Sequence, residues 1–128
     1  MDFKSNEAIY LQIAAHISEQ IVLGRWAVNE KIPSVRELAA DFQVNPNTVM
    51  RTYEHLQQSG IIFNKRGIGF FVAEKAVEHI NKQQRERFLT QDLPEFFKNM
   101  YLLGISLEEI KSRYEAYLST YHKDEDKQ

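Results

Sequence analysis

The chain has 128 residues, a length typical of one domain with a modest core and an appended element. Hydrophobic residues make up 43% and charged residues 27% of the chain, close to the average soluble globular protein, and its fifteen aromatic residues argue against a disordered polymer. With no cysteine, disulfides and thiolate metal sites are excluded. No apolar run approaches the roughly 20 residues that span a bilayer, and no export signal is evident, so we expect a cytoplasmic protein without a membrane partner.

The net charge of −2 is unevenly distributed. Residues 1–73 contain seven basic and seven acidic residues, whereas residues 74–128 contain nine and eleven. The excess of acidic over basic residues therefore lies entirely in residues 74–128. The first part therefore has room for a local basic surface, but a broad polyanion-binding field is excluded.

A first amphipathic helix is predicted over residues 7–23. Isoleucine recurs there every four residues, which places one apolar stripe along a helix. Gly24 supplies the left-handed residue at which many helices end. The stripe consists of Ile9, Ile13, Ile17 and Ile21.

A second, short helix is predicted to begin at Ser34 and to end near Gln43. Ser34 and Glu37 form a capping box, in which each side chain accepts a hydrogen bond from the backbone N–H of the other residue. The residues expected to be buried are Val35, Leu38, Ala39 and Phe42.

A third helix and a hairpin follow. Asn45 is expected to cap the helix and Pro46 to occupy its first position, where a missing N–H costs nothing. After Gly60, residues 61–63 and 70–72 predict two strands joined by a turn with two glycines and a basic pair. The helix is expected to bury Val49, Tyr53 and Leu56.

Residues 74–128 are expected to form a second, helical domain after a first domain at residues 1–73. Residues 73–90 are strongly charged and favour a helix that bridges the two units. Asp92 is expected to cap a new helix that ends at Gly104. That helix is expected to bury Leu93, Phe96, Phe97, Met100 and Leu103.

A last helix is predicted after a second capping box, formed by Ser106 and Glu109. Its apolar residues are spaced by 3, 4, 3 and 4 positions, which is the rhythm of a coiled-coil seam. A homodimer joined through residues 75–122 is therefore expected. The candidate dimerisation residues are Phe96, Phe97, Met100, Leu107, Ile110, Tyr114, Tyr117 and Tyr121.

Three short helices followed by a hairpin have the order of a winged helix-turn-helix. Ala39 is the small residue where the two helices meet, and Val49 anchors the second of them. Gln43 stands where a glycine is usual, so the turn either holds a non-glycine residue at positive φ or is wider. We expect an α+β fold, a winged helix-turn-helix with a short all-helical C-terminal dimerisation unit.

The motifs at residues 32–39, 44–56, 60–62 and 65–72 resemble the DNA-binding domain of the GntR family of bacterial transcription regulators. The resemblance covers residues 8–73. The short helical remainder resembles the YtrA-like subfamily, whose members carry a small dimerisation unit in place of a large effector domain. The resemblance implies that the targets are nearby operons, often ones that encode ABC transporters.

The residues themselves also favour DNA binding. Asn47 and Thr48 begin the helix that would enter a major groove, and Arg51 follows one turn later. An asparagine can pair with adenine, and an arginine with phosphate or guanine. The resemblance implies DNA contacts for Arg36, Asn47, Thr48 and the wing glycines, whereas Pro46 replaces an arginine found in many members. The candidate DNA-binding residues are Ser34, Arg36, Asn45, Asn47, Thr48, Arg51, Lys65, Arg66, Gly67 and Gly69.

We therefore expect a sequence-specific repressor that binds a palindromic double-stranded operator as a homodimer, without enzymatic activity or cofactor. Two alternatives stay open: a sensor with a small-molecule effector between the C-terminal helices, and a winged-helix module that binds another protein. No metal is expected, since the histidines lie in different predicted elements. They are His16, His55, His79 and His122.

Overall fold

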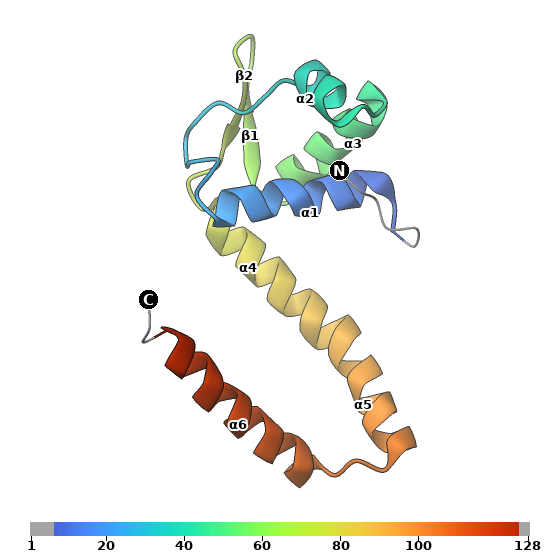
Figure 1. Ribbon diagram of the computed structural model, residues 1–128. Coiled ribbons are helices and arrows are strands. Elements are labelled where there is room, and N and C mark those ends of the chain that lie inside the picture. Colours follow the sequence, from blue (N-terminus) through green and yellow to red (C-terminus); the bar gives the residue numbers. More distant parts are fainter. Residues whose placement is uncertain (1–6, 126–128) are drawn as a thin grey trace. The chain divides into compact units, whose positions relative to one another are not determined.

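The computed structural model describes residues 7–125, with side chains for residues 7–121, and the chain divides into two compact units (Figure 1). The first unit ends at Arg85 and the second begins at Glu86. The boundary therefore lies later than predicted, because the first part of helix α4 (Ala76–Arg87) belongs to the first unit.

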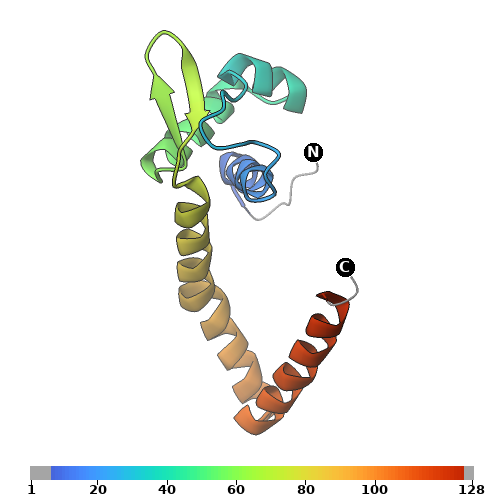
Figure 2. The ribbon, with the colours of Figure 1, turned by 90° about the vertical axis from the view of Figure 1, so that its left-hand side faces the viewer.

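The first unit contains three helices followed by a two-stranded antiparallel sheet, the winged helix-turn-helix order that the sequence predicts (Figures 1 and 2). The strands pair in register from Ile62 opposite Val72 to Lys65 opposite Gly69. The elements are α1 (Ile9–Val22), α2 (Val35–Phe42), α3 (Pro46–Gln58), β1 (Ile62–Lys65) and β2 (Gly69–Val72).

The segment between α1 and α2 pairs with the side of β2 that β1 leaves free. Lys31 forms an isolated antiparallel bridge with Phe71. The N–H of Asn29 donates to the carbonyl oxygen of Val72 at 2.9 Å, and the N–H of Ile32 donates to that of Phe70 at 2.9 Å. The base of the hairpin is therefore held by backbone hydrogen bonds on both sides of β2.

The turn between α2 and α3 follows the predicted capping chemistry. Both halves of the capping box of Ser34 and Glu37 are present. The Asn45 side chain accepts a hydrogen bond from the N–H of Asn47 at 2.8 Å. Gln43 has φ 55° and ψ 47°. Of the two turns that the sequence leaves open, the structure thus has the one with a non-glycine residue at positive φ.

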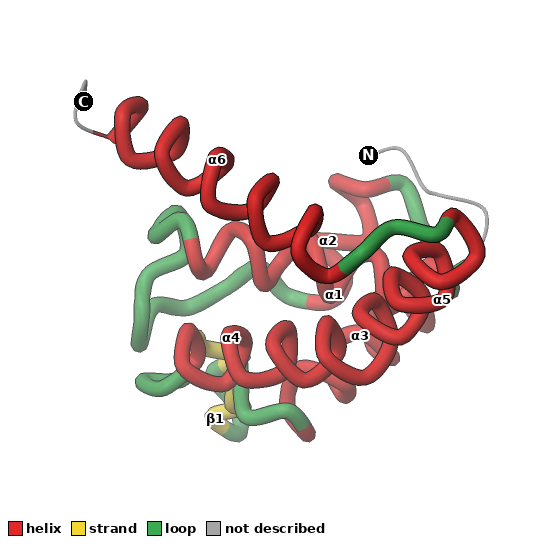
Figure 3. Tube along the Cα trace, turned by 90° about the horizontal axis from the view of Figure 1, so that it is seen from below, coloured by secondary structure: helices red, strands yellow, loops and turns green. Residues whose placement is uncertain are grey.

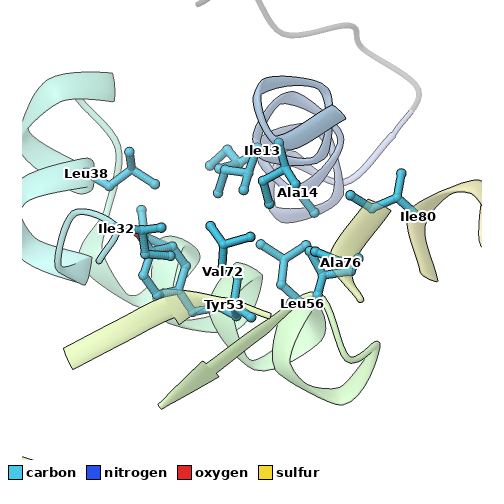
Figure 4. Packing of buried hydrophobic residues seen from close by; sticks show 14 of the residues in the cluster. Ile13, Ala14, Ile32, Leu38, Tyr53, Leu56, Val72, Ala76 and Ile80 are labelled. Carbon is cyan, nitrogen blue, oxygen red and sulfur yellow. The ribbon is translucent and has the colours of Figure 1, made fainter. Parts of the chain in front are cut away.

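The core of the first unit lies between α1, α2, α3, the hairpin and the start of α4 (Figure 4). Ala76 and Ile80 of α4 are buried in it, and this is why the unit extends past the hairpin. Val35 and Phe42, predicted to be buried, are only partly buried but pack against the core. Buried side chains at its centre are Ile13, Ile17, Leu38, Val49, Tyr53, Leu56 and Val72.

Tyr53 joins α3 to the segment that precedes α2. Its side chain is fully buried, and its hydroxyl donates to the carbonyl oxygen of Pro33 at 2.6 Å. The ring packs edge-on against Phe70, with 5.0 Å between the ring centroids. Burial raises the pKa of the Tyr53 phenol, with a further contribution from the negative charge of Glu37.

The predicted cap at Asp92 is wrong, because the helix does not restart there. The residues from Phe88 to Asp92 form a π-helical turn, η1, that leads from α4 directly into α5 (Leu93–Leu103) (Figure 3). Asp92 has helical dihedrals and makes no side-chain cap. Pro94 lacks the N–H of a regular turn, and the wider π turn, closed by Leu93 N–H to the Phe88 carbonyl, accommodates it.

The second unit buries little of its own apolar surface. None of the residues that the sequence predicts as buried on α5 is buried, and this prediction is wrong for the isolated chain. Helix α6 (Leu107–Glu125) begins as predicted at Ser106, whose hydroxyl accepts from the N–H of Glu109 at 3.1 Å. α5 and α6 diverge from the turn between them, so neither covers the other's apolar side (Figures 1 and 2). Among the described residues, no helix has the length and apolarity needed to traverse a bilayer.

Candidate nucleic-acid interface

The candidate residues of the helix-turn-helix lie at the starts of α2 and α3. Arg36 is exposed in the first turn of α2, because the core side of that helix is occupied by Leu38 and Ala39. The side-chain oxygens of Ser34 and Asn45 accept backbone hydrogen bonds. The structure therefore gives these two residues a capping role at the two helix starts.

Helix α3 presents a polar side opposite its core side. Val49, Tyr53 and Leu56 are buried as predicted, while Asn47 is exposed and Thr48 is half-buried. No described residue forms a hydrogen bond with the Asn47 amide group, so its donor and its acceptor are available to a base edge.

Arg51 contacts a residue that the sequence did not single out. Its guanidinium carbon lies 4.0 Å from the centroid of the Tyr10 ring, on α1. The Tyr10 ring in turn packs edge-on against His55 of α3, and the Tyr10 carbonyl accepts from the Thr52 hydroxyl at 2.8 Å. Tyr10 and Arg51 are 41 positions apart in the sequence, so no local pattern could have revealed this contact.

The tip of the wing carries the predicted basic residues. Lys65, Arg66 and Gly67 are all exposed, and Gly67 has φ 80°, a conformation that favours glycine. Gly69 has φ 139°, and a Cβ atom at this position would lie 2.9 Å from the Cε atom of Lys31. The Lys31 side chain therefore lies against the wing at Gly69. It adds a third basic residue beside Lys65 and Arg66, one that sequence reasoning missed.

An aromatic pair supports one of these cations. Phe63 and Phe71 stack across the hairpin with 5.6 Å between their centroids, and both are half-buried. The Lys65 ammonium lies 4.7 Å from the centroid of the Phe71 ring and 5.9 Å from that of Phe63. Aromatic faces attract cations, so the pair holds the Lys65 side chain along the wing.

The arginines of α2 and α3 and the cations at the wing tip keep their charges unneutralised. Within the described part of the chain, no carboxylate forms an ion pair with Arg36, Arg51, Lys65 or Arg66. In Figure 1, α2 and the hairpin tip lie on the upper side of the first unit, away from the body of α1. Exposed cationic side chains thus occur at the start of α2, on α3 and at the wing tip, with the exposed carboxylate of Glu37 beside Arg36.

Binding of a metal ion would require a cluster of side chains that could act as its ligands. No group of three or more histidine, aspartate or glutamate side chains among the described residues could hold a metal ion. The side chain of His122 lies outside the described side chains.

Residues 9–72 match the family model of the bacterial regulatory proteins of the gntR family. The chain belongs to the GntR family. It is 41% identical to the HTH-type transcriptional regulator YhcF of Bacillus subtilis over 84% of this chain and 88% of that protein. It is also 32% identical to the transcriptional repressor YtrA of the same organism, over 86% of this chain and 84% of that protein.

A solved structure supports the same assignment. A putative GntR-family regulator from Bacteroides thetaiotaomicron superposes with a TM-score of 0.79 and 47% identity, over 89% of this chain and 99% of that one. The similarity therefore includes the C-terminal helices as well as the winged helix. The resemblance to YtrA-like members is confirmed, and the chain is a transcription regulator with a DNA-binding domain. The family consists of regulators and not of enzymes.

Proposed function

We propose that this regulator represses transcription by binding a palindromic double-stranded DNA site as a homodimer. The observation that carries the proposal is the unpaired basic and amide surface of α2, α3 and the wing tip. Its exposed members include Arg36, Asn47 and Arg51. In helix-turn-helix proteins, the start of the second helix enters the major groove and dimers bind two half-sites.

Each part of this surface has a different role. Asn47 reads adenine from the first turn of α3, and Thr48 meets a base edge or phosphate beside it. Arg36 and Arg51 bind phosphate or guanine from either side of that turn. Lys65 and Arg66 bind the backbone or the minor groove, and the wing glycines Gly67 and Gly69 let the hairpin approach it closely. Ser34 and Asn45 keep the N–H groups at the two helix starts oriented toward the phosphates.

The second unit supplies the dimer interface. Leu103 is 72% exposed, Leu107 is 73% exposed and Tyr101 is 86% exposed. Soluble monomers rarely expose apolar residues in such density, and a second copy related by a two-fold axis would cover them. The candidate residues Phe96, Phe97, Tyr114, Tyr117 and Tyr121 are likewise exposed, and Met100 and Ile110 are half-buried.

The DNA-binding part is tested by selecting duplexes from random DNA with the wild-type protein and measuring affinities for the selected duplex. We expect the Arg36→Ala and Asn47→Ala variants each to lose about 1–3 kcal/mol of specific binding. Arg25→Ala is the matched control, because Arg25 is exposed on the same unit outside the proposed surface. Failure to select any preferred sequence, or unchanged affinity in both variants, would refute DNA recognition by this surface.

The dimer is tested by light scattering. The chain weighs 15.1 kDa, and we expect twice that mass for the wild type at micromolar concentration. Leu103→Glu should give the monomer mass, because it places a charge in the proposed interface. Leu23→Glu is the control, since Leu23 is an exposed leucine of the first unit. A monomeric wild type would overturn the proposal of a homodimer.

Repression is supported by the function named for the relative YtrA. It is tested by transcription in vitro from a promoter that overlaps the selected DNA site. Transcription should fall as protein is added and should not fall with the Arg36→Ala variant. An increase in transcript would identify an activator instead.

A further inference from the structure

We infer that Tyr10, on α1, is a positioning residue that orients the Arg51 guanidinium for a phosphate of the bound DNA. The inference rests on the proposed DNA binding and adds a residue outside the helix-turn-helix to it. Its basis is the 4.0 Å separation between the guanidinium carbon of Arg51 and the centroid of the Tyr10 ring.

The contact leaves Arg51 able to bind an anion. A guanidinium that lies over an aromatic ring uses its face, whereas its N–H donors point outward in the plane. No described carboxylate competes for these donors, because Arg51 forms no ion pair within residues 7–121. The Tyr10 ring therefore restricts the side chain without neutralising it.

Tyr10 is held on α3 by two contacts that do not involve Arg51, one to its backbone and one to its ring. The fully buried Thr52 donates its hydroxyl to the Tyr10 carbonyl at 2.8 Å. The imidazole of His55 packs edge-on against the ring, with 6.1 Å between the centroids. Tyr10 is thus fixed to the same helix that carries Arg51, and its position does not depend on the Arg51 side chain.

The position of Arg51 on α3 directs it to the DNA. Arg51 lies four residues after Asn47 and three after Thr48, so the three side chains share one side of the helix. A phosphate beside the major groove that receives Asn47 is the anion that this geometry fits. A long cationic side chain loses conformational entropy when it binds a phosphate. The Tyr10 ring restricts the Arg51 side chain in the unbound protein, so less entropy is lost on DNA binding.

The test is a double-mutant cycle with a fluorescent duplex selected from random DNA by the wild-type protein. Tyr10→Leu and Tyr10→Met remove the ring but keep an apolar side chain and the backbone carbonyl that Thr52 binds. Each should weaken binding about two- to fivefold, the size expected for one exposed cation–π contact. In an Arg51→Ala background, the same substitutions should have no further effect. Tyr10→Phe keeps the ring and should bind as the wild type.

Salt dependence separates this inference from the proposed function. Arg51→Ala should reduce the slope of log affinity against log salt by about 0.9, the loss of one phosphate contact. If Arg51→Ala leaves slope and affinity unchanged while Arg36→Ala weakens binding, DNA recognition stands and the role of Tyr10 falls. The inference also falls if Tyr10→Leu has the same effect in both backgrounds, or if Tyr10→Phe loses as much as Tyr10→Leu. Failure to select any duplex removes the proposed function and this inference together.

Discussion

Replacing Tyr53 by phenylalanine tests how the helix-turn-helix is held together. The substitution keeps the buried ring and its packing against Phe70, but removes the hydroxyl that donates to the Pro33 carbonyl at 2.6 Å. A typical buried hydrogen bond contributes about 0.5–1.5 kcal/mol, and a carbonyl left without a partner can cost more. We expect Tyr53→Phe to lower the free energy of unfolding by about 1–2 kcal/mol at neutral pH.

Because the Tyr53 hydroxyl can ionise, the difference in free energy of unfolding between the wild type and the Tyr53→Phe variant depends on pH. The pKa of Tyr53 is raised from its ordinary value of 10.0, because burial disfavours the charged phenolate. The stabilisation linked to this proton is complete below pH 10 and is lost as the pH rises, because the unfolded chain ionises first. At pH 11 the loss is about 1.4 kcal/mol for the wild type, from RT ln(1 + 10). Phenylalanine cannot ionise, so the difference between the two proteins should shrink by about that amount.

Urea unfolding followed by the fluorescence of Trp26 measures both effects, since Trp26 packs against the core of the first unit. Tyr10→Phe is the matched control, because Tyr10 is only half-buried on the same unit and its hydroxyl forms no hydrogen bond with a described residue, so stability should change little at either pH. A Tyr53→Phe variant as stable as the wild type at pH 7 would refute the hydrogen-bond argument. A deficit that stays constant between pH 7 and pH 11 would refute the burial of a neutral phenol.

Three other substitutions probe the backbone and the unit boundary. Gln43→Gly should raise the free energy of unfolding by about 0.5–1 kcal/mol, because glycine adopts φ 55° without strain, and denaturant midpoints will show whether it does. Gly69→Ala should lower it by about 1–3 kcal/mol, since φ 139° is strained for alanine and the new Cβ would meet Lys31; an equal midpoint would contradict this. Ile80→Ala should cost the first unit about 2–5 kcal/mol in Trp26-detected unfolding, whereas Val77→Ala on the exposed side of α4 should be nearly neutral. If Ile80→Ala lowers the free energy of unfolding as little as Val77→Ala does, α4 does not belong to the core of the first unit.

Local chemistry explains why so much of the first unit was predictable. The capping box of Ser34 and Glu37 and the cap at Asn45 act over two or three residues, so their signals are contiguous in the chain. The candidate residues Arg36 and Asn47 were likewise predicted to be exposed, because the buried positions of α2 and α3 follow the helical period. These features depend on neighbours in the sequence and hardly on the rest of the fold.

What the sequence determined by itself was therefore the three helices of the first unit, the caps of α2 and α3, the hairpin and the polar side of α3. Only the tertiary structure decided that Ile80 belongs to the winged-helix core, that Tyr10 lies against Arg51 and that Lys31 crosses Gly69. It also decided that the apolar residues of α5 stay uncovered within one chain. Apolar periodicity shows which side of a helix avoids water, but the partner that covers that side is chosen by packing between distant residues.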